Sequence, residues 1–233
     1  MTNHSSGLPP TRGDLIIDEL LRFSRSALSA SAVVLAWLNE DGDPSDAGNI
    51  GLREALLEDY FSAGVYHHDP LFPGVLVSKP EKIHCLSSLA SHGTTRTAAQ
   101  DYTMFLTRYG YRDEIDLVFS NGAAPSAHLV ALSDTGFAYP RPEIEALHRF
   151  LQHTISGHPY IRKQTQAALL RDRFALTHRE IQVVDLIRSG ASNADIGKNP
   201  GIGLATVKTH VIRVLDKLSV DSRCALVAFV NEL

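Results

Sequence analysis

The stretch "GIGLATVKTHVIRVLDKLSVDSR", residues 201–223, decides the fold of the C-terminal part of the chain. Apolar residues at Val207, Val211, Val214 or Leu215, and Leu218 predict a helix over about 204–218 with one buried stripe. The remaining face carries Lys208, Thr209, His210, Ile212 and Arg213. Lysine and arginine can neutralise phosphates, threonine can bond to phosphates or base edges, and isoleucine can meet a thymine methyl. The pattern is compatible with an ordinary solvated face or with a helix that binds in a DNA groove.

The segments on either side of this helix contain further helix boundaries. Upstream, Thr177 and Glu180 have the spacing of a capping box, and Gly190 ends the helix that they begin. A short helix follows, with Ser192 or Asn193 as its N-cap.

Two further signals bound the short helix and the last one. Pro200 is predicted to stop the short helix, and Asp221 or Ser222 caps a fourth helix. The turns between these helices are short. Residues 173–233 are therefore predicted to form an all-α, four-helix helix-turn-helix domain.

The pattern "LTHRE…G.SNADI…I…TVKTHV…V..KL.V.SR" resembles the DNA-binding domain of LuxR-type transcription regulators. The resemblance implies that DNA is contacted by residues Ser192, Asn193, Thr206, Lys208, Thr209, His210, Ile212 and Arg213. It also implies that Leu226, Val227 and Val230 contribute to dimerisation on a twofold-symmetric site. Three departures, Gly197, Pro200 and Gly203, surround the turn before the third helix. We expect a looser turn there, and a DNA affinity that depends more on dimerisation.

Charge is divided unevenly along the chain. Residues 1–160 hold 11 Lys+Arg and 19 Asp+Glu, a net −8, whereas residues 161–233 hold 11 and 7, a net +4, which together give the total of −4. This division favours a polyanion-binding part joined to a part with another role, although two solvated surfaces of different sign would look the same.

The N-terminal part reads as helices around an antiparallel sheet. Amphipathic helices are predicted over 14–30, 49–64 and 96–110, and a long interrupted helix over 140–170. Strands are predicted over 32–38, 112–120 and 126–134, the last two joined by a turn at Asn121-Gly122. The predicted fold class is α+β, with an N-terminal α/β/α sandwich over 13–160, a linker over 161–172 and the helix-turn-helix domain over 173–233.

Within "LLEDYFSAGVYHHDPLF", Tyr60 and Asp69-Pro70 resemble the signature of the autoinducer-binding domain of quorum-sensing LuxR proteins. The resemblance implies a ligand site that includes Trp37, Leu56, Tyr60, Tyr66, Asp69, Pro70 and His84. Leu56 and His84 stand where the family has aromatic residues, and Asp113 or Glu114 stands near a family glycine. We therefore expect a diverged, "solo" type of sensor whose ligand is acyl-homoserine-lactone-like or altered. From the residues alone, Asp69 could equally be a turn residue and Trp37 a core residue.

Other function classes lack a supporting pattern. A phosphorylatable receiver would need more than the acidic pair Glu40-Asp41. A metal sensor would draw on His67, His68, His84, Cys85 and His92, but their spacings match no zinc signature. Motifs of nucleophilic or phosphate-binding enzymes are lacking, so we expect no enzyme, no metal and no cofactor.

The composition is that of a globular protein, 44% hydrophobic and 21% charged. Cys85 and Cys224 cannot form a disulfide framework, and the start of the sequence has no secretory pattern. No apolar run reaches the length of a membrane span. We expect a cytoplasmic protein without a membrane partner.

These patterns predict a homodimeric, ligand-responsive transcription regulator, of the quorum-sensing type and an activator, that binds an inverted-repeat operator as double-stranded DNA. RNA polymerase is a further expected partner. The main alternative is a ligand-independent regulator of the same type, whose N-terminal domain serves dimerisation or protein interaction. A third possibility is a small-molecule-binding protein that no longer uses its C-terminal domain.

Overall fold

The computed structural model describes residues 14–39, 41–90, 98–122, 124–138, 140–198 and 204–233. The chain divides into two compact units, Met1–Ile161 (unit 1) and Arg162–Leu233 (unit 2).

Unit 1 is built on one five-stranded antiparallel sheet in the order β2-β1-β5-β4-β3. The strands are β1 (Ala32–Leu38), β2 (Pro44–Ile50), β3 (Ile83–Cys85), β4 (Asp113–Asn121) and β5 (Ala124–Ser133). β4 and β5 form a hairpin in which Asn121 pairs with Ala124, and Gly122 has the left-handed backbone (φ 61°) that the turn needs.

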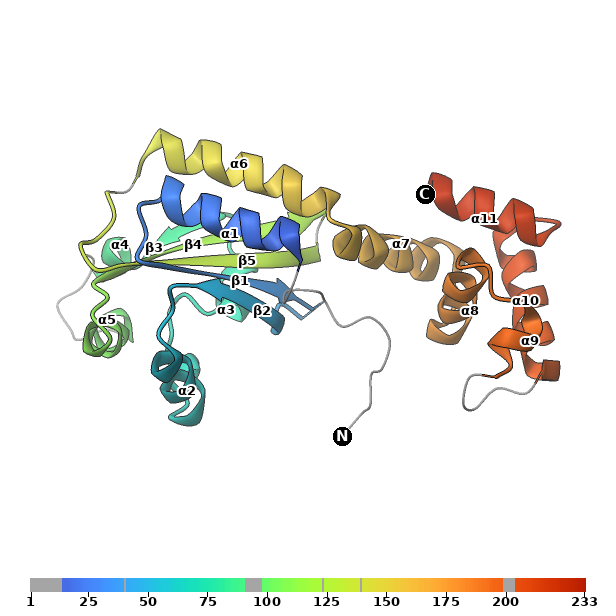
Figure 1. Ribbon diagram of the computed structural model, residues 1–233, viewed down its shortest axis with the longest axis horizontal. Coiled ribbons are helices and arrows are strands. Elements are labelled where there is room, and N and C mark those ends of the chain that lie inside the picture. The colour runs from blue at the N-terminus through green and yellow to red at the C-terminus, as the bar shows by residue number, and fades with distance from the viewer. Residues whose placement is uncertain (1–13, 40, 91–97, 123, 139, 199–203) are drawn as a thin grey trace. The chain divides into compact units, whose positions relative to one another are not determined.

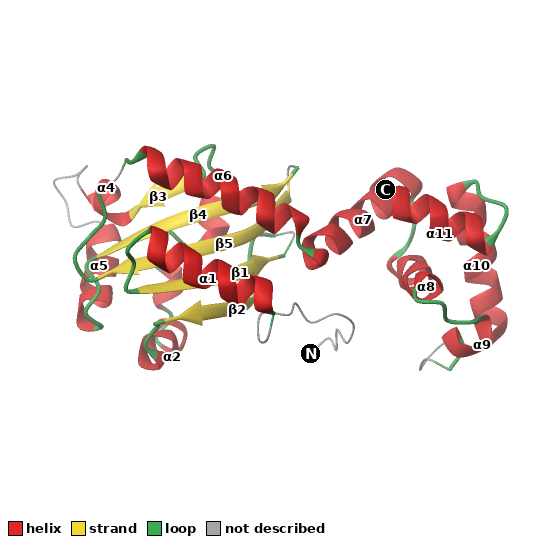
Figure 2. Cartoon of the chain, turned by 45° about the horizontal axis from the view of Figure 1, so that its top comes forward, coloured by secondary structure: helices red, strands yellow, loops and turns green. Residues whose placement is uncertain are grey.

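Helices cover both faces of this sheet. α1 (Leu15–Ala27) and α6 (Pro142–Gly157) lie side by side on one face (Figures 1 and 2). The other face is covered by shorter elements: α2 (Glu54–Ser62), η1 (Val65–His67), α3 (Pro73–Leu76), α4 (Leu86–Ala90) and α5 (Ala98–Arg108). The predicted α/β/α sandwich around an antiparallel sheet is confirmed.

The alternation of side chains along each strand divides the core of unit 1 into two layers. Val33, Leu35 and Trp37 of β1 pack in the layer beneath α1 and α6. Val34 and Ala36 point to the opposite face, toward α2 and α3. The strands thus give each face a distinct set of side chains.

Unit 2 is helical. α7 (Pro159–Phe174) begins in unit 1, and its later residues pack in unit 2, where Leu170 is buried. It is followed by α8 (His178–Arg188), α9 (Asn193–Ile196), α10 (Leu204–Leu218) and α11 (Arg223–Glu232). The buried side chains of α8 to α11 form one core: Val183, Val184, Ile187, Ile196, Val207, Val214, Leu218, Leu226 and Val230.

Several local predictions need correction. β2 was not predicted, and its last residues overlap the start of the helix predicted over 49–64; β3, α3 and α4 were also not predicted. The interruption predicted within 140–170 falls at His158, whose extended backbone (ψ 136°) separates α6 from α7. Residues 161–172, predicted as a linker, lie within α7.

Candidate functional site

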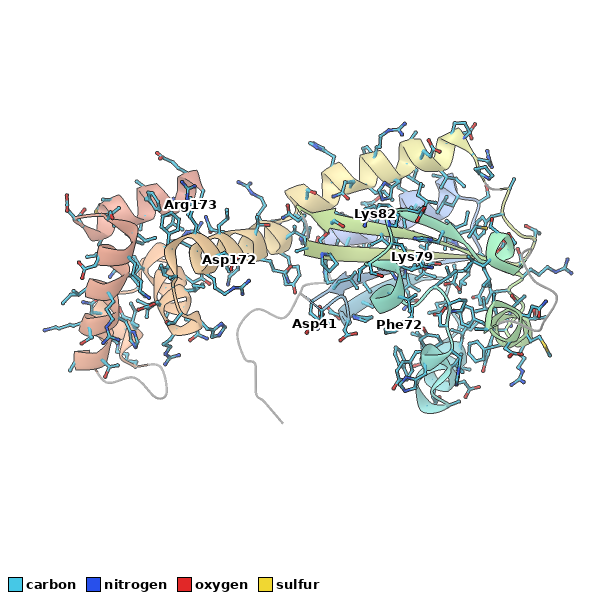
Figure 3. The ribbon with its side chains drawn as sticks, turned by 180° about the vertical axis from the view of Figure 1, so that it is seen from behind. Asp41, Phe72, Lys79, Lys82, Asp172 and Arg173 are labelled. Atoms are coloured by element: carbon cyan, nitrogen blue, oxygen red, sulfur yellow. The ribbon has the colours of Figure 1, made fainter. Side chains whose placement is uncertain are left out.

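Unit 1 contains a cavity of about 200 Å³ between the sheet and the helices α2, α3 and α5. Its apolar wall is formed by Val34, Ala36, Pro44, Ala47, Leu52, Leu56, Leu57, Phe61, Phe72, Pro73, Leu106, Val130 and Leu132. Phe72, labelled in Figure 3, lies on the face of the sheet that α2 and α5 cover. A concave apolar site with a few polar groups is typical of a small-molecule binding site.

Tyr60 and Asp69 form the first polar anchor of this cavity. The Tyr60 hydroxyl donates to Asp69 Oδ2 at 2.7 Å, and the amide of Leu71 donates to Asp69 Oδ1 at 2.8 Å. Burial raises the pKa of Asp69, although these two hydrogen bonds act in the opposite direction. Burial and the neighbouring Asp69 also raise the pKa of Tyr60, so its hydroxyl remains a neutral donor.

A second polar group lies on the strands. Glu114 of β4 is buried, lines the cavity and accepts a hydrogen bond from the Tyr102 hydroxyl at 3.0 Å. Asp116 is fully buried on the same face of β4, and His128 of β5 lines the cavity. Burial, reinforced by Asp116, raises the pKa of Glu114 well above its usual range. Burial lowers the pKa of His128 to about 4, so the ring is neutral near pH 7.

Only some of the predicted ligand residues line the cavity. Leu56, Tyr60 and Asp69 line the cavity together. Tyr66 lies behind Tyr60, with ring centroids 6.3 Å apart, and it does not line the cavity. Pro70 is also absent from the wall.

Trp37 and His84 also lie apart from this wall. Trp37 lies on the opposite face of the sheet, packed against His158 and Tyr160, because odd-numbered residues of β1 face α1 and α6. Its assignment to the ligand site is wrong. His84 of β3 is buried, and its Nε2 lies 3.0 Å from the carbonyl of Glu81, outside the cavity wall.

Four polar residues of the wall were not in the predicted ligand set: Asn49, Tyr102, Glu114 and His128, although Glu114 was one of two residues placed near the family glycine. The signal was present for Glu114 and His128, because an ionisable residue inside an apolar strand segment is buried when both faces of the sheet are covered. Asp113, the other candidate at the family glycine, faces away from the cavity and accepts hydrogen bonds from the amides of Ser87 and Phe137 at 3.0 and 3.1 Å.

Unit 2 presents a second candidate site on α10. Thr177 and Glu180 form the predicted capping box, and the buried Glu180 carboxylate accepts a hydrogen bond from Lys217 Nζ of α10 at 2.7 Å. Burial alone would raise the pKa of Glu180, but the hydrogen bonds from Lys217 and Thr177 lower it. This ion pair fixes α8 against α10.

The two faces of α10 differ as predicted. Val207, Val214 and Leu218 are buried in the core of unit 2, and Val211 is half-buried. The opposite face exposes Thr206, Lys208, Thr209, Ile212 and Arg213. Ile212 is 59% exposed and adds an apolar contact to this otherwise polar face.

The lysines of unit 2 and Arg213 differ in whether an acid neutralises them. Lys163, Lys198 and Lys217 each form an ion pair, with Asp185, Asp195 and Glu180 respectively. Lys208 and Arg213 have no recorded hydrogen bond or ion pair with any of the described residues. Their charges are therefore free to meet an external anion.

Other predicted DNA contacts are less open. His210 is half-buried, and its Nδ1 is buried without a hydrogen-bond partner among the described residues. The Ser192 hydroxyl lies 2.6 Å from Asp195 Oδ2 in a second capping box, which begins α9. The Asn193 side chain lies 3.4 Å from Arg223 of α11.

The burial of Leu226 and Val230 corrects their predicted role in dimerisation. Leu226 and Val230 have no exposed surface, because they fill the core of unit 2, and Val227 is half-buried beside them. Leu226 and Val230 therefore cannot supply an interface to a second copy, whereas the role of Val227 stays a prediction. The described residues do not include Pro200, Ile202 and Gly203 of the predicted turn. They also do not include His92, one of the residues considered for a metal site.

Comparison with known proteins agrees with the helical geometry of unit 2. Residues 175–230 match the family described as bacterial regulatory proteins, luxR family. Unit 2 therefore carries a LuxR-family helix-turn-helix domain.

Two curated relatives match the chain at 37% identity over 79 residues: the probable csgAB operon transcriptional regulatory protein of Salmonella typhimurium and the CsgBAC operon transcriptional regulatory protein of Escherichia coli. The match covers 34% of this chain and spans about a third (33%) of each relative's length. Among solved structures, Escherichia coli SdiA is similar at 15% identity with a TM-score of 0.44, covering 95% of this chain and 92% of that chain. In the part of the chain that the structure describes, no helix combines the length and apolarity needed to cross a membrane.

Proposed function

We propose that the chain is a ligand-responsive transcription regulator, whose unit 2 binds DNA through α10 and whose unit 1 binds a small molecule. The single observation that carries the proposal is the exposed face of α10, where Lys208 and Arg213 have free charges beside the exposed Ile212. The LuxR-family match of residues 175–230 supports this role.

The side chains of α10 define how the domain would engage DNA. Lys208 and Arg213 supply cations for phosphates or guanine edges, Thr206 and Thr209 supply hydroxyl groups, and Ile212 supplies a methyl contact for thymine. α10 is 15 residues long, and a helix of this kind fits the major groove with its exposed face toward the bases. Two copies would read an inverted repeat.

The cavity of unit 1 supports the sensing half of the proposal. The half-buried Tyr60 and the buried Asp69 are hydrogen-bonded to each other at the wall of a mostly apolar space. Buried polar groups of this kind select a ligand, because a molecule that lacks the matching group leaves them without partners. The ligand then acts by binding one state of the dimer more tightly than the other.

Selection of double-stranded DNA from a random pool with the purified full-length protein tests the proposal. We expect the selection to recover an inverted repeat. The protein should bind this site at least about a thousandfold more tightly than a scrambled duplex of the same length. Uniform, steeply salt-dependent binding to all sequences would contradict specific regulation.

A further inference from the structure

We propose that the cavity of unit 1 recognises an organic cation, a protonated amine carried on a short apolar body. The inference rests on the proposed function, because it names the class of ligand for the same cavity. The inference is based on Glu114, Asp116 and His128, which are not part of the hydrogen-bonded pair Tyr60–Asp69.

The first observation is the sign of the charge at the cavity. Asp69 and Glu114 both line the wall, and Asp116 lies beside Glu114 on the same face of β4. None of the described residues that form the wall is lysine or arginine. Buried carboxylates are costly unless a cation or several donors meet them, and the described wall residues include no lysine or arginine that could do so.

The second observation is a cluster of buried ionisable groups at this end of the cavity. His128 Nε2 lies 2.6 Å from Asp116 Oδ1, and Glu114 and Asp116 are hydrogen-bonded to each other on the same face of β4. His128 is 3% exposed and lines the cavity, and its ring is neutral near pH 7. The cluster thus holds two acids without a full positive charge beside them, and a cationic ligand would supply that charge.

The donors already present do not saturate Asp69 and Glu114. Asp69 accepts from the Tyr60 hydroxyl and the Leu71 amide, and Glu114 accepts from the Tyr102 hydroxyl, whereas each ionised carboxylate offers about four acceptor sites. A primary ammonium group carries three N–H donors and a positive charge. It matches the unused acceptors and, once Glu114 ionises, the negative charge of the wall.

The third observation is the aromatic wall. Tyr60, Phe61, Phe72 and Tyr102 line the cavity, and the ring of Tyr60 lies 5.1 Å from that of Phe61 and 6.4 Å from that of Tyr102. Aromatic faces attract organic cations through the ring quadrupole, most strongly where water is excluded. The rest of the wall is aliphatic and suits a short hydrocarbon body.

A metal ion is a less suitable occupant. Within the described ranges, no three His, Cys, Asp or Glu side chains are arranged so that they could hold one. A cavity of about 200 Å³ lies below the range of roughly 300–1,000 Å³ usual for drug-sized ligands, so the amine should be small.

The acids determine how pH should act on binding. Burial raises the pKa of Glu114 and Asp116, so the free cavity holds them protonated over a wider pH range than usual. An ammonium ion binds best when they are ionised, and its affinity should therefore rise with pH. The titratable groups around Glu114 are Tyr60 of α2, Asp69, Tyr102 of α5, Asp116 of β4, His128 of β5 and His84 of β3.

Calorimetric titration of the full-length protein with three probes of equal chain length tests the inference: hexylammonium, hexanol and hexanoate. At about pH 8 we expect hexylammonium to bind at least about tenfold more tightly than hexanol, with hexanoate weakest. The advantage of the amine over the alcohol should shrink at about pH 5. Glu114→Gln should remove most of that advantage, whereas Glu58→Gln, an exposed acid on α2, should leave it unchanged.

The outcomes separate this inference from the proposed function. Hexanol binding as tightly as hexylammonium would overturn the cation and leave a ligand cavity in place. Failure of all three probes would also overturn it, while the DNA selection reports on regulation independently. Trp37 is the single tryptophan and lies on the opposite face of the sheet, so its fluorescence reports whether the Glu114→Gln variant folds. If the variant does not fold, the relative affinities of the three probes for the unaltered protein still test the inference.

Discussion

Glu114 and Asp116 place two carboxyl groups on a strand whose neighbouring side chains are apolar. Residues 115, 117 and 119 of β4 pack under α1 and α6, while Glu114 and Asp116 face the cavity. Each acid is almost fully buried, so each disfavours its own ionisation. The stability of unit 1 should therefore depend on pH.

The direction of that dependence follows from the raised pKa of Glu114. As pH rises, the unfolded chain releases this proton before the folded chain does, and folded-state stability is lost through that range. His128, whose pKa is lowered to about 4, acts in the opposite sense only below about pH 6.5. We expect the melting temperature reported by Trp37 fluorescence to fall as pH rises above about 6.5, where His128 no longer opposes the loss.

Glu114→Gln supplies the comparison for this prediction, because it keeps the shape of the side chain and removes one ionisation. The fall in melting temperature should become smaller in that variant. A melting temperature that is independent of pH in the unaltered protein would contradict the raised pKa.

The sequence predicted only some of the residues that line the cavity. Tyr60 and Asp69 could be paired by their resemblance to a known signature. Trp37 could not be placed from its type, because the face of the sheet depends on the register of β1 against β2 and β5. The same register decides that Glu114, and not Asp113, reaches the cavity.

The helices of unit 2 show what local sequence can determine. α10 begins and ends at the predicted residues 204 and 218, and the capping box of α8 is formed by Thr177 and Glu180. These signals are local, since each helix carries its own cap and apolar stripe. β2 was missed because "PSDAGNI" holds one β-branched residue and pairs as an edge strand through its backbone.

The assignment of Leu226 and Val230 to dimerisation failed for a related reason. An apolar stripe on α11 serves equally for packing against its own domain or a second copy, and only the tertiary structure shows that the domain core takes both residues.

Ser192 allows a test of α9 as an element. Its hydroxyl caps the helix by accepting from the Asp195 amide at 3.2 Å, which places a structural role beside the predicted DNA contact. Ser192→Ala should destabilise α9 by about 1 kcal/mol, because an orphan amide loses its acceptor. Hydrogen exchange of the amides of residues 195–198 should become faster.

Ser192→Asn is the matched variant, since asparagine is an equally good N-cap. It should restore slow exchange. If alanine and asparagine behave alike, the capping role assigned to Ser192 is wrong.

For the whole molecule, two units of opposite charge are joined in one chain. Residues 1–160 are acidic and residues 161–233 are basic, as the division of charged residues indicates. Among the described residues of unit 2, four cations are ion-paired with acids of the same unit, whereas Lys208 and Arg213 of α10 are exposed and can act on a polyanion. The charge of the whole chain, −4, would by itself disfavour DNA binding.

The most direct test is to compare the Lys208→Ala variant with the unaltered full-length protein. The affinity of each for the selected DNA site is measured over a range of salt concentrations. We expect affinity to fall about tenfold and the salt slope to fall by about one, since one phosphate contact is lost. Trp37 fluorescence melting should not change, because Lys208 is exposed. Lys163→Ala, which removes an ion-paired cation of the same unit, is the control and should retain affinity. Equal affinity and equal salt slope for Lys208→Ala and the unaltered protein would contradict DNA binding by α10.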